Sequence, residues 1–125
     1  MRLNQVTVSV RDVKGAIAFY QTLGLKLIVQ NDHYARFECP DGEATFSIGL
    51  DPEAKGVSQT VVYFEDQALD ATVARLKHAG LTFEDDPHDQ SWLWREAHLR
   101  DPSGNLICLY WAGENRLNPP WRLQD

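Results

Sequence analysis

The chain has 125 residues, of which 43% are hydrophobic and 24% are charged, and its net charge is −6 at neutral pH. These values predict one globular domain or two small fused modules, and they argue against nucleic acid as a partner, because a negative surface repels phosphate backbones. No apolar run approaches the ~20 residues of a membrane span, and the alternating start of the chain is not typical of a signal peptide. We therefore expect a cytoplasmic protein without a membrane partner.

The first half of the chain predicts a strand, a helix and three further strands. Residues 3–10 alternate between apolar and polar side chains, which is typical of a strand with one face on a core. Residues 13–23 carry apolar side chains at spacings of three and four, between Asp12 as N-cap and Gly24 as C-terminal stop, which predicts an amphipathic helix. Three strands are then predicted at 25–30, 34–39 and 44–50.

The second half repeats this order. Residues 59–66 predict a strand that ends in an aspartate, and residues 67–80 predict a helix that ends in a glycine. Three more strands are predicted at 81–84, 91–99 and 106–112, the last two joined by the turn DPSGN. A repeat of this size indicates two similar modules that bury their sheet faces.

We therefore predict a single domain over residues 1–125, built from two β-α-β-β-β modules at about 1–52 and 57–112. A tail at 113–125 follows them. Because the tail contains two prolines and Trp121, we expect no helix there, and we expect the tail to pack across the opening of the sheets or onto a partner subunit.

The segments VTVSVRDVKGAIAFYQTLGLKL and RDPSGNLICLYW, set in these paired modules, resemble the vicinal oxygen chelate superfamily. Its members include glyoxalase I, extradiol dioxygenases, and bleomycin and fosfomycin resistance proteins. The resemblance covers essentially the whole chain. It implies an α+β fold in which curved mixed sheets form an open barrel around a cavity, with the helices outside. We also expect a homodimer.

The resemblance further implies one divalent metal, held by one residue from each of four strands. Carried onto this chain, the four positions are Gln5, Phe46 or Ser47, Gln59 and Cys108. Catalytic metal sites use imidazole and carboxylate, with thiolate favoured by zinc, whereas this set offers two neutral amides and a thiol. We therefore predict no cofactor and no metal ligand at these positions, with a divalent metal held by other residues as the alternative.

Aromatic side chains gather in the second module, at Tyr63, Trp92, Trp94, Tyr110 and Trp111. A cavity lined by amides and rings suits a flat small molecule held by stacking and a few hydrogen bonds. We predict a ligand pocket formed by Gln5, Ser47, Gln59, Tyr63, Cys108 and Tyr110. The alternative is that the rings fill the core or a dimer interface.

Glu96 and His98 lie two residues apart on one face of a predicted strand, so they are candidates for a catalytic acid/base couple. The alternative is a polar row that faces solvent. Cys108 could pair with His98, although a cysteine on an apolar strand is more often an inert core thiol, and we expect the same of Cys39. The acidic stretch 85–89 is expected to be a solvated charge cluster.

Two functions follow. The first is a protein that binds a small organic ligand in the cavity without the superfamily's metal. The second is a metal-dependent lyase, isomerase or dioxygenase whose ligands the sequence does not identify, with Glu38, Glu96 and His98 as the candidates.

Overall fold

The computed structural model describes residues 1–54 and 58–124, so the predicted start of the second module at residue 57 lies outside the described residues. The chain divides into two compact units. Unit 1 contains Met1–Gln59 together with Asp101–Asn105, and unit 2 contains Thr60–Arg100 and Leu106–Asp125.

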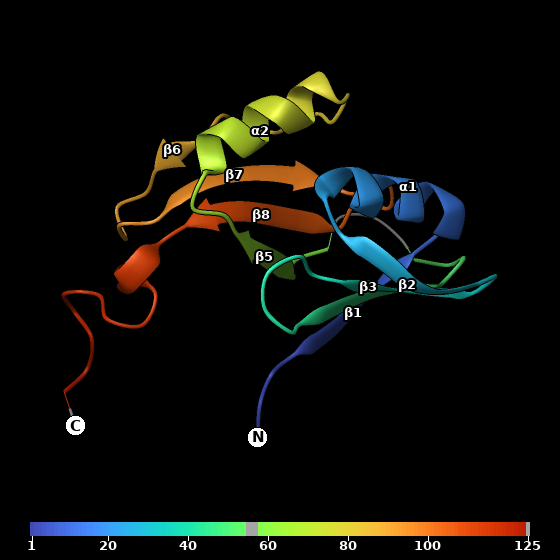
Figure 1. Ribbon diagram of the computed structural model, residues 1–125, viewed down its shortest axis with the longest axis horizontal. Coiled ribbons are helices and arrows are strands. Elements are labelled where there is room, and N and C mark those ends of the chain that lie inside the picture. The colour runs from blue at the N-terminus through green and yellow to red at the C-terminus, as the bar shows by residue number, and fades with distance from the viewer. Residues whose placement is uncertain (55–57, 125) are drawn as a thin grey trace. The chain divides into compact units, whose positions relative to one another are not determined.

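Unit 1 has the predicted order of one strand, one helix and three strands (Figure 1). The strands pair in the order β1-β4-β3-β2, with β1 parallel to β4 and the other neighbours antiparallel. Gly24 ends the helix in a left-handed conformation with φ 119°, as expected for a C-terminal glycine. The bounds are β1 (Gln5–Val10), α1 (Val13–Leu23), β2 (Lys26–Asn31), β3 (Tyr34–Glu38) and β4 (Thr45–Leu50).

The core of unit 1 lies between α1 and one face of its sheet. Tyr20 on α1 packs its ring 4.6 Å from that of Phe46 on β4 and 5.8 Å from that of Phe37 on β3, measured between centroids. All three side chains are buried, as is Ile48. On β1, Val6 and Val8 share the face of their partners Phe46 and Ile48, while Gln5 lies on the other face, which confirms the alternation expected for the first strand.

The turn at Asp101–Asn105 belongs to unit 1, although the sequence repeat assigns it to the second module. The buried carboxylate of Asp101 accepts a hydrogen bond from the Tyr20 hydroxyl at 2.7 Å. It also accepts hydrogen bonds from the backbone N–H groups of Ser103 and Asn105, both at 2.9 Å. The Asn105 amide in turn donates to the carbonyl oxygen of Ser9 at 2.9 Å. This one carboxylate therefore joins the turn to the helix α1.

Unit 2 repeats the strand order of unit 1, as β5-β8-β7-β6, with β5 parallel to β8. Figure 1 shows α2 lying along one face of β7 and β8. Both units are thus open four-stranded mixed sheets, each with one helix, which confirms the predicted α+β fold of two β-α-β-β-β modules. The bounds are β5 (Val61–Glu65), α2 (Leu69–His78), β6 (His88–Asp89), β7 (Arg95–Arg100), β8 (Leu106–Trp111) and a 3₁₀ helix η1 (Gly113–Asn115).

Two predicted strands of the second module are corrected. In the predicted strand 81–84 only Phe83 forms a bridge, to Leu99, and the edge strand is instead β6, whose two polar residues pair with Arg95 and Glu96 on β7. The predicted strand 91–99 begins only at Arg95, because residues 90–93 form a turn in which Leu93 has a φ of 68°. Both segments contain apolar residues typical of strands, but most of their residues outside β7 have no backbone partner on a neighbouring strand.

The tail begins with the 3₁₀ helix η1, so the expectation of no helix in the tail is wrong for these three residues, which precede the two prolines. The indole N–H of Trp94 donates to the carbonyl oxygen of Asn115 at 3.3 Å. Beyond this contact Trp121 is 57% exposed, so the expectation that it packs within the chain is wrong, and packing onto a partner stays a prediction.

Candidate functional site

The site candidates of the second module share the face of the unit 2 sheet that is not covered by α2. In the strand register, Tyr63 on β5 lies opposite Cys108 on β8, and Cys108 lies opposite His98 on β7. Tyr110 lies opposite Glu96 in the same way. Paired residues project to the same side of a sheet, and so do residues two apart on one strand. All five side chains therefore belong to one face.

Three rings form a continuous aromatic surface on this face. Trp94 and Tyr110 are stacked with their centroids 4.8 Å apart. Tyr63 meets both rings edge-on, at 5.5 Å from Tyr110 and 5.9 Å from Trp94. Tyr110 is buried, but Tyr63 is 47% exposed. The cluster is thus packed on its inner side and open to a ligand at Tyr63.

Glu96 is a buried carboxylate with a complete set of partners. Its side chain is 3% exposed. Its Oε2 accepts a hydrogen bond from the Trp92 indole at 2.9 Å, and its Oε1 accepts one from the Gln90 amide at 3.2 Å. The alternative that Glu96 and His98 form a solvent-facing row is therefore wrong for Glu96. Strand pairing places it beside Tyr110, and the turn at Leu93 brings the Trp92 indole within hydrogen-bond distance of it.

His98 lies between two carboxylates. Its Nδ1 is 2.7 Å from the Oδ2 of Asp85, whose other oxygen accepts the backbone N–H of His98 at 2.6 Å. Its Nε2 is 3.3 Å from the Oε1 of Glu96. Asp85 was predicted only as part of a solvated cluster. Its neighbours do face outward, since Asp86 pairs with Lys77 and Asp89 with Arg95, but Asp85 turns inward to orient the imidazole.

Cys108 lies close to the side chains of Glu96 and His98. One donor atom from each of the three residues lies within 4.8 Å of the other two donor atoms. The thiol is fully buried. Burial, and then the charges of Glu96 and Asp85, raise the pKa of Cys108 to about 12. The thiol therefore stays protonated at neutral pH.

This environment predicts a difference between the two cysteines in their reaction with iodoacetamide. The thiolate is the reactive form, and a raised pKa in the folded state keeps Cys108 protonated until the pH approaches about 12. Burial also raises the pKa of Cys39, but that side chain is partly exposed. In mildly alkaline, metal-free buffer, mass spectrometry of the folded protein is expected to show Cys39 alkylated at least about tenfold faster than Cys108. Equal rates before denaturation would contradict the burial of Cys108.

The sequence-predicted residues of unit 1 form a separate polar group. The Gln5 amide donates to the Ser47 hydroxyl oxygen at 2.6 Å, while its carbonyl oxygen accepts a hydrogen bond from Thr45. Ser47 is also 2.7 Å from the Tyr34 hydroxyl oxygen. Ser47 therefore shares the face of Gln5, whereas Phe46 lies in the core. Gln59 is exposed and precedes β5.

These residues do not fit the metal that the superfamily implies. Of the four carried-over positions, Gln5 and Ser47 already satisfy each other, Gln59 is an amide, and Cys108 alone offers a donor that can become anionic. A dication needs charged or strongly donating ligands to replace its water shell. No step of a mechanism is therefore assigned to a metal at these four positions.

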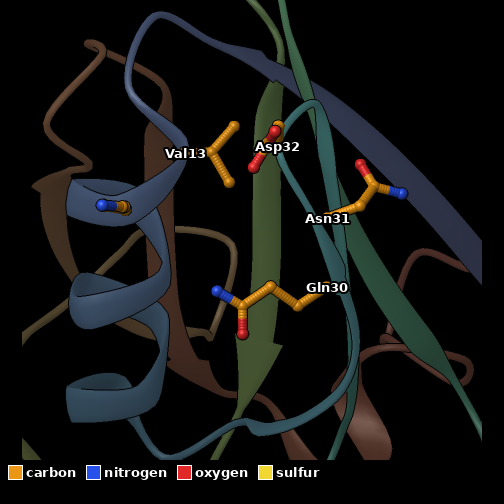
Figure 2. A pocket seen from close by; sticks show the side chains of 5 residues that line it. Val13, Gln30, Asn31 and Asp32 are labelled. Carbon is orange, nitrogen blue, oxygen red and sulfur yellow. The ribbon is translucent and has the colours of Figure 1, made fainter.

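Unit 1 also has a surface pocket of about 320 Å³, lined by Val13, Lys14, Gln30, Asn31 and Asp32. Figure 2 shows Val13 on α1 and Gln30 at the end of β2 on opposite sides of it. The pocket contains no aromatic ring and none of the predicted site residues, so the candidate site remains the open face of unit 2.

Comparison with known proteins now identifies the class. Residues 2–109 match the model of the glyoxalase/bleomycin resistance protein/dioxygenase superfamily, and the chain belongs to this superfamily, as its resemblance to the vicinal oxygen chelate fold implied.

Among its relatives is the uncharacterized protein YraH of Bacillus subtilis, which is 32% identical over 88% of this chain and 98% of YraH. Two solved structures share the fold. A bleomycin-binding protein in complex with bleomycin has a TM-score of 0.75 at 19% identity, covering 89% of this chain and 98% of that one. The lactoylglutathione lyase of Agrobacterium tumefaciens has a TM-score of 0.72 at 16% identity, covering 94% and 96%.

Among the described residues, neither helix has the length and apolar character needed to cross a membrane.

Proposed function

We propose that this protein binds a small organic molecule with a flat, unsaturated group, and that the ligand stacks on Tyr63 on the open face of unit 2. The observation that carries the proposal is that the Tyr63 ring stays half exposed while it packs edge-on against the stacked pair Trp94 and Tyr110. A ring held by two others offers a large contact area without losing much conformational freedom when a ligand binds. A bleomycin-binding protein of the same fold supports this class of function.

The polar groups beside the rings support a ligand that also carries hydrogen-bond donors or a positive charge. Asp85 and Glu96 are both carboxylates, and they face a single imidazole. The predicted contributions of Gln5, Ser47 and Gln59 to the same pocket stay a prediction, and so does the homodimer.

Replacing Tyr63 with alanine is expected to weaken ligand binding about tenfold, because loss of one stacking contact removes about 1.4 kcal/mol of binding free energy. Bleomycin and a panel of planar aromatic compounds are first screened by thermal shift, and the affinity of the best compound is then measured by isothermal titration calorimetry. Tyr63→Phe keeps the ring and is expected to bind like the native protein.

The matched control is Trp111→Ala, which removes a partly exposed ring from the same sheet. Trp111 pairs with Arg95 and projects to the opposite face. Equal losses for Tyr63→Ala and Trp111→Ala would show that binding does not occur on the proposed face. If no compound of the panel binds the native protein, the proposal is wrong for this ligand class.

A second candidate function is a metal-dependent lyase, isomerase or dioxygenase of the superfamily. The gathering of Glu96, His98 and Cys108 favours it, since Glu96 and His98 add the carboxylate and the imidazole that the four superfamily positions lack to the thiol of Cys108. Its first requirement, a bound metal, can be tested without knowing the reaction.

A further inference from the structure

We propose that Glu96, His98 and Cys108 form a binding site for a divalent transition metal, with zinc the best match. The site differs from the position that the superfamily uses, because Glu96 and His98 both come from β7 and only Cys108 occupies one of the four carried-over positions. The inference does not depend on the ligand-binding proposal, because Tyr63 is not one of the donors.

The spacing of the two donors on β7 matches a tetrahedral ion. The Nε2 of His98 and the Oε1 of Glu96 are 3.3 Å apart. Zinc bonds of about 2.0–2.1 Å to nitrogen and oxygen, at a tetrahedral angle, place two such donors about 3.3 Å apart. The sulfur of Cys108 lies within 4.8 Å of both other donors. Three protein ligands leave the fourth position for water or another small molecule.

A second observation is the orientation of His98. The Oδ1 of Asp85 accepts a hydrogen bond from the backbone N–H of this residue at 2.6 Å, and the Oδ2 of Asp85 is 2.7 Å from its Nδ1. With the proton on Nδ1, the lone pair of Nε2 points toward the acceptor oxygen of Glu96. Two acceptors that face each other require a cation between them, either a proton or a metal ion. A carboxylate behind the imidazole is also the usual outer partner of a metal-binding histidine.

The partners of Glu96 are compatible with a metal as well. The Trp92 indole donates to Oε2 and the Gln90 amide donates to Oε1 at 3.2 Å, so an ion would use the second lone pair of Oε1. The carboxylate is 3% exposed, and a buried charge requires compensation. One carboxylate and one thiolate neutralise a dication, and the thiol proton is released to solvent when the metal binds.

The test uses the full chain after treatment with a chelator, titrated with Co²⁺ as a spectroscopic probe for zinc. Native protein is expected to bind one equivalent of Co²⁺, to show a thiolate-to-cobalt charge-transfer band, and to lose the band when Zn²⁺ is added. Cys39→Ser, which removes the other cysteine, is expected to keep the band, and Cys108→Ser is expected to lose it. X-ray absorption at the zinc edge of native protein is expected to show one sulfur ligand, and this measurement needs no variant to fold.

The carboxylates behind the site provide a second matched pair. Asp85→Asn is expected to weaken Co²⁺ binding about 10–100-fold, as for other partners of metal-binding histidines. Asp86→Asn, one residue further, removes a carboxylate that pairs with Lys77 and is expected to leave the affinity unchanged.

Three results would overturn the proposal. If chelator-treated protein binds neither Co²⁺ nor Zn²⁺, Glu96, His98 and Cys108 do not form a metal site. Cobalt binding without a charge-transfer band, or with a band that persists in Cys108→Ser, would show an adventitious ion only. Equal effects of Asp85→Asn and Asp86→Asn would show that Asp85 does not orient a metal ligand. Ligand binding at Tyr63 is measured separately in chelator-treated protein, so the two proposals can fail independently.

Discussion

Replacing Phe46 with alanine is expected to lower the free energy of unfolding by about 3–5 kcal/mol, the usual range for truncating a buried phenylalanine. The Phe46 ring is 2% exposed and lies between α1 and the sheet of unit 1, against Tyr20 and Phe37. Its removal leaves a cavity that the neighbouring rings cannot fill without leaving their own positions. Chemical denaturation followed by circular dichroism measures the loss.

Ser47→Ala is the control for this prediction, because it changes the next residue on the same strand. Ser47 faces the polar side of the sheet, where it accepts from Gln5 and contacts Tyr34, so its loss is expected to cost about 1 kcal/mol. A larger loss for Ser47→Ala than for Phe46→Ala would mean that β4 is turned the other way. The same pair thus tests which of the two residues belongs to the face of Gln5.

The helices and the order of the strands could be predicted because the sequence carries local signals for them. Gly24 and Gly80 both adopt positive φ at the ends of their helices, and the apolar spacing between Val13 and Leu23 matches a helical face. The edge strand β6 could not be predicted in this way. Its residues His88 and Asp89 are polar and exposed, and they form a strand only because β7 supplies backbone partners.

The sequence names several residues of the candidate site but not their geometry. Strand parity correctly placed Cys108 and Tyr110 on one face. The burial of Glu96 depends on its register with Tyr110 and on the turn that carries Trp92, and neither follows from the local pattern. Asp85 lies 13 residues from His98 in an acidic stretch, where nothing distinguishes it from Asp86. Only the folded structure shows that Asp85 contacts His98 and Asp86 contacts Lys77.

The fold of the superfamily and its metal position depend on different features of the sequence. The fold transfers because it rests on backbone pairing and apolar periodicity, which this chain preserves in both modules. The metal position does not transfer, because it rests on the chemistry of four side chains, and Gln5, Ser47 and Gln59 do not provide it. Donors of the required kind lie instead on β7 and β8 of unit 2. The buried side chains of this chain therefore indicate a metal site more directly than the ligand positions of the superfamily do.

Replacing Asp101 with alanine is expected to lower the free energy of unfolding by about 3 kcal/mol, because it leaves several buried donors without an acceptor. The carboxylate accepts from the Tyr20 hydroxyl, from two backbone N–H groups and from the Asn105 side chain. Burial and the adjacent carboxylate also raise the pKa of Tyr20, so this hydroxyl stays a donor over the whole range in which the protein is handled. Asp101→Asn keeps one acceptor oxygen, and about half of the loss is expected for it.

Asp41→Ala is the matched control, because Asp41 occupies the turn of the first module that corresponds to the turn at Asp101. Asp41 is exposed, and its replacement is expected to change the stability by less than about 0.5 kcal/mol. The two turns differ in chemistry: Cys39 occupies the position of Asp101 in the first turn, where Asp41 faces solvent, whereas Asp101 holds a turn of the second repeat in unit 1. If both variants lose the same stability in urea denaturation, the carboxylate of Asp101 does not hold this turn. If only Asp101→Ala loses stability, the turn contributes to the folding of unit 1 although it lies between two strands of unit 2.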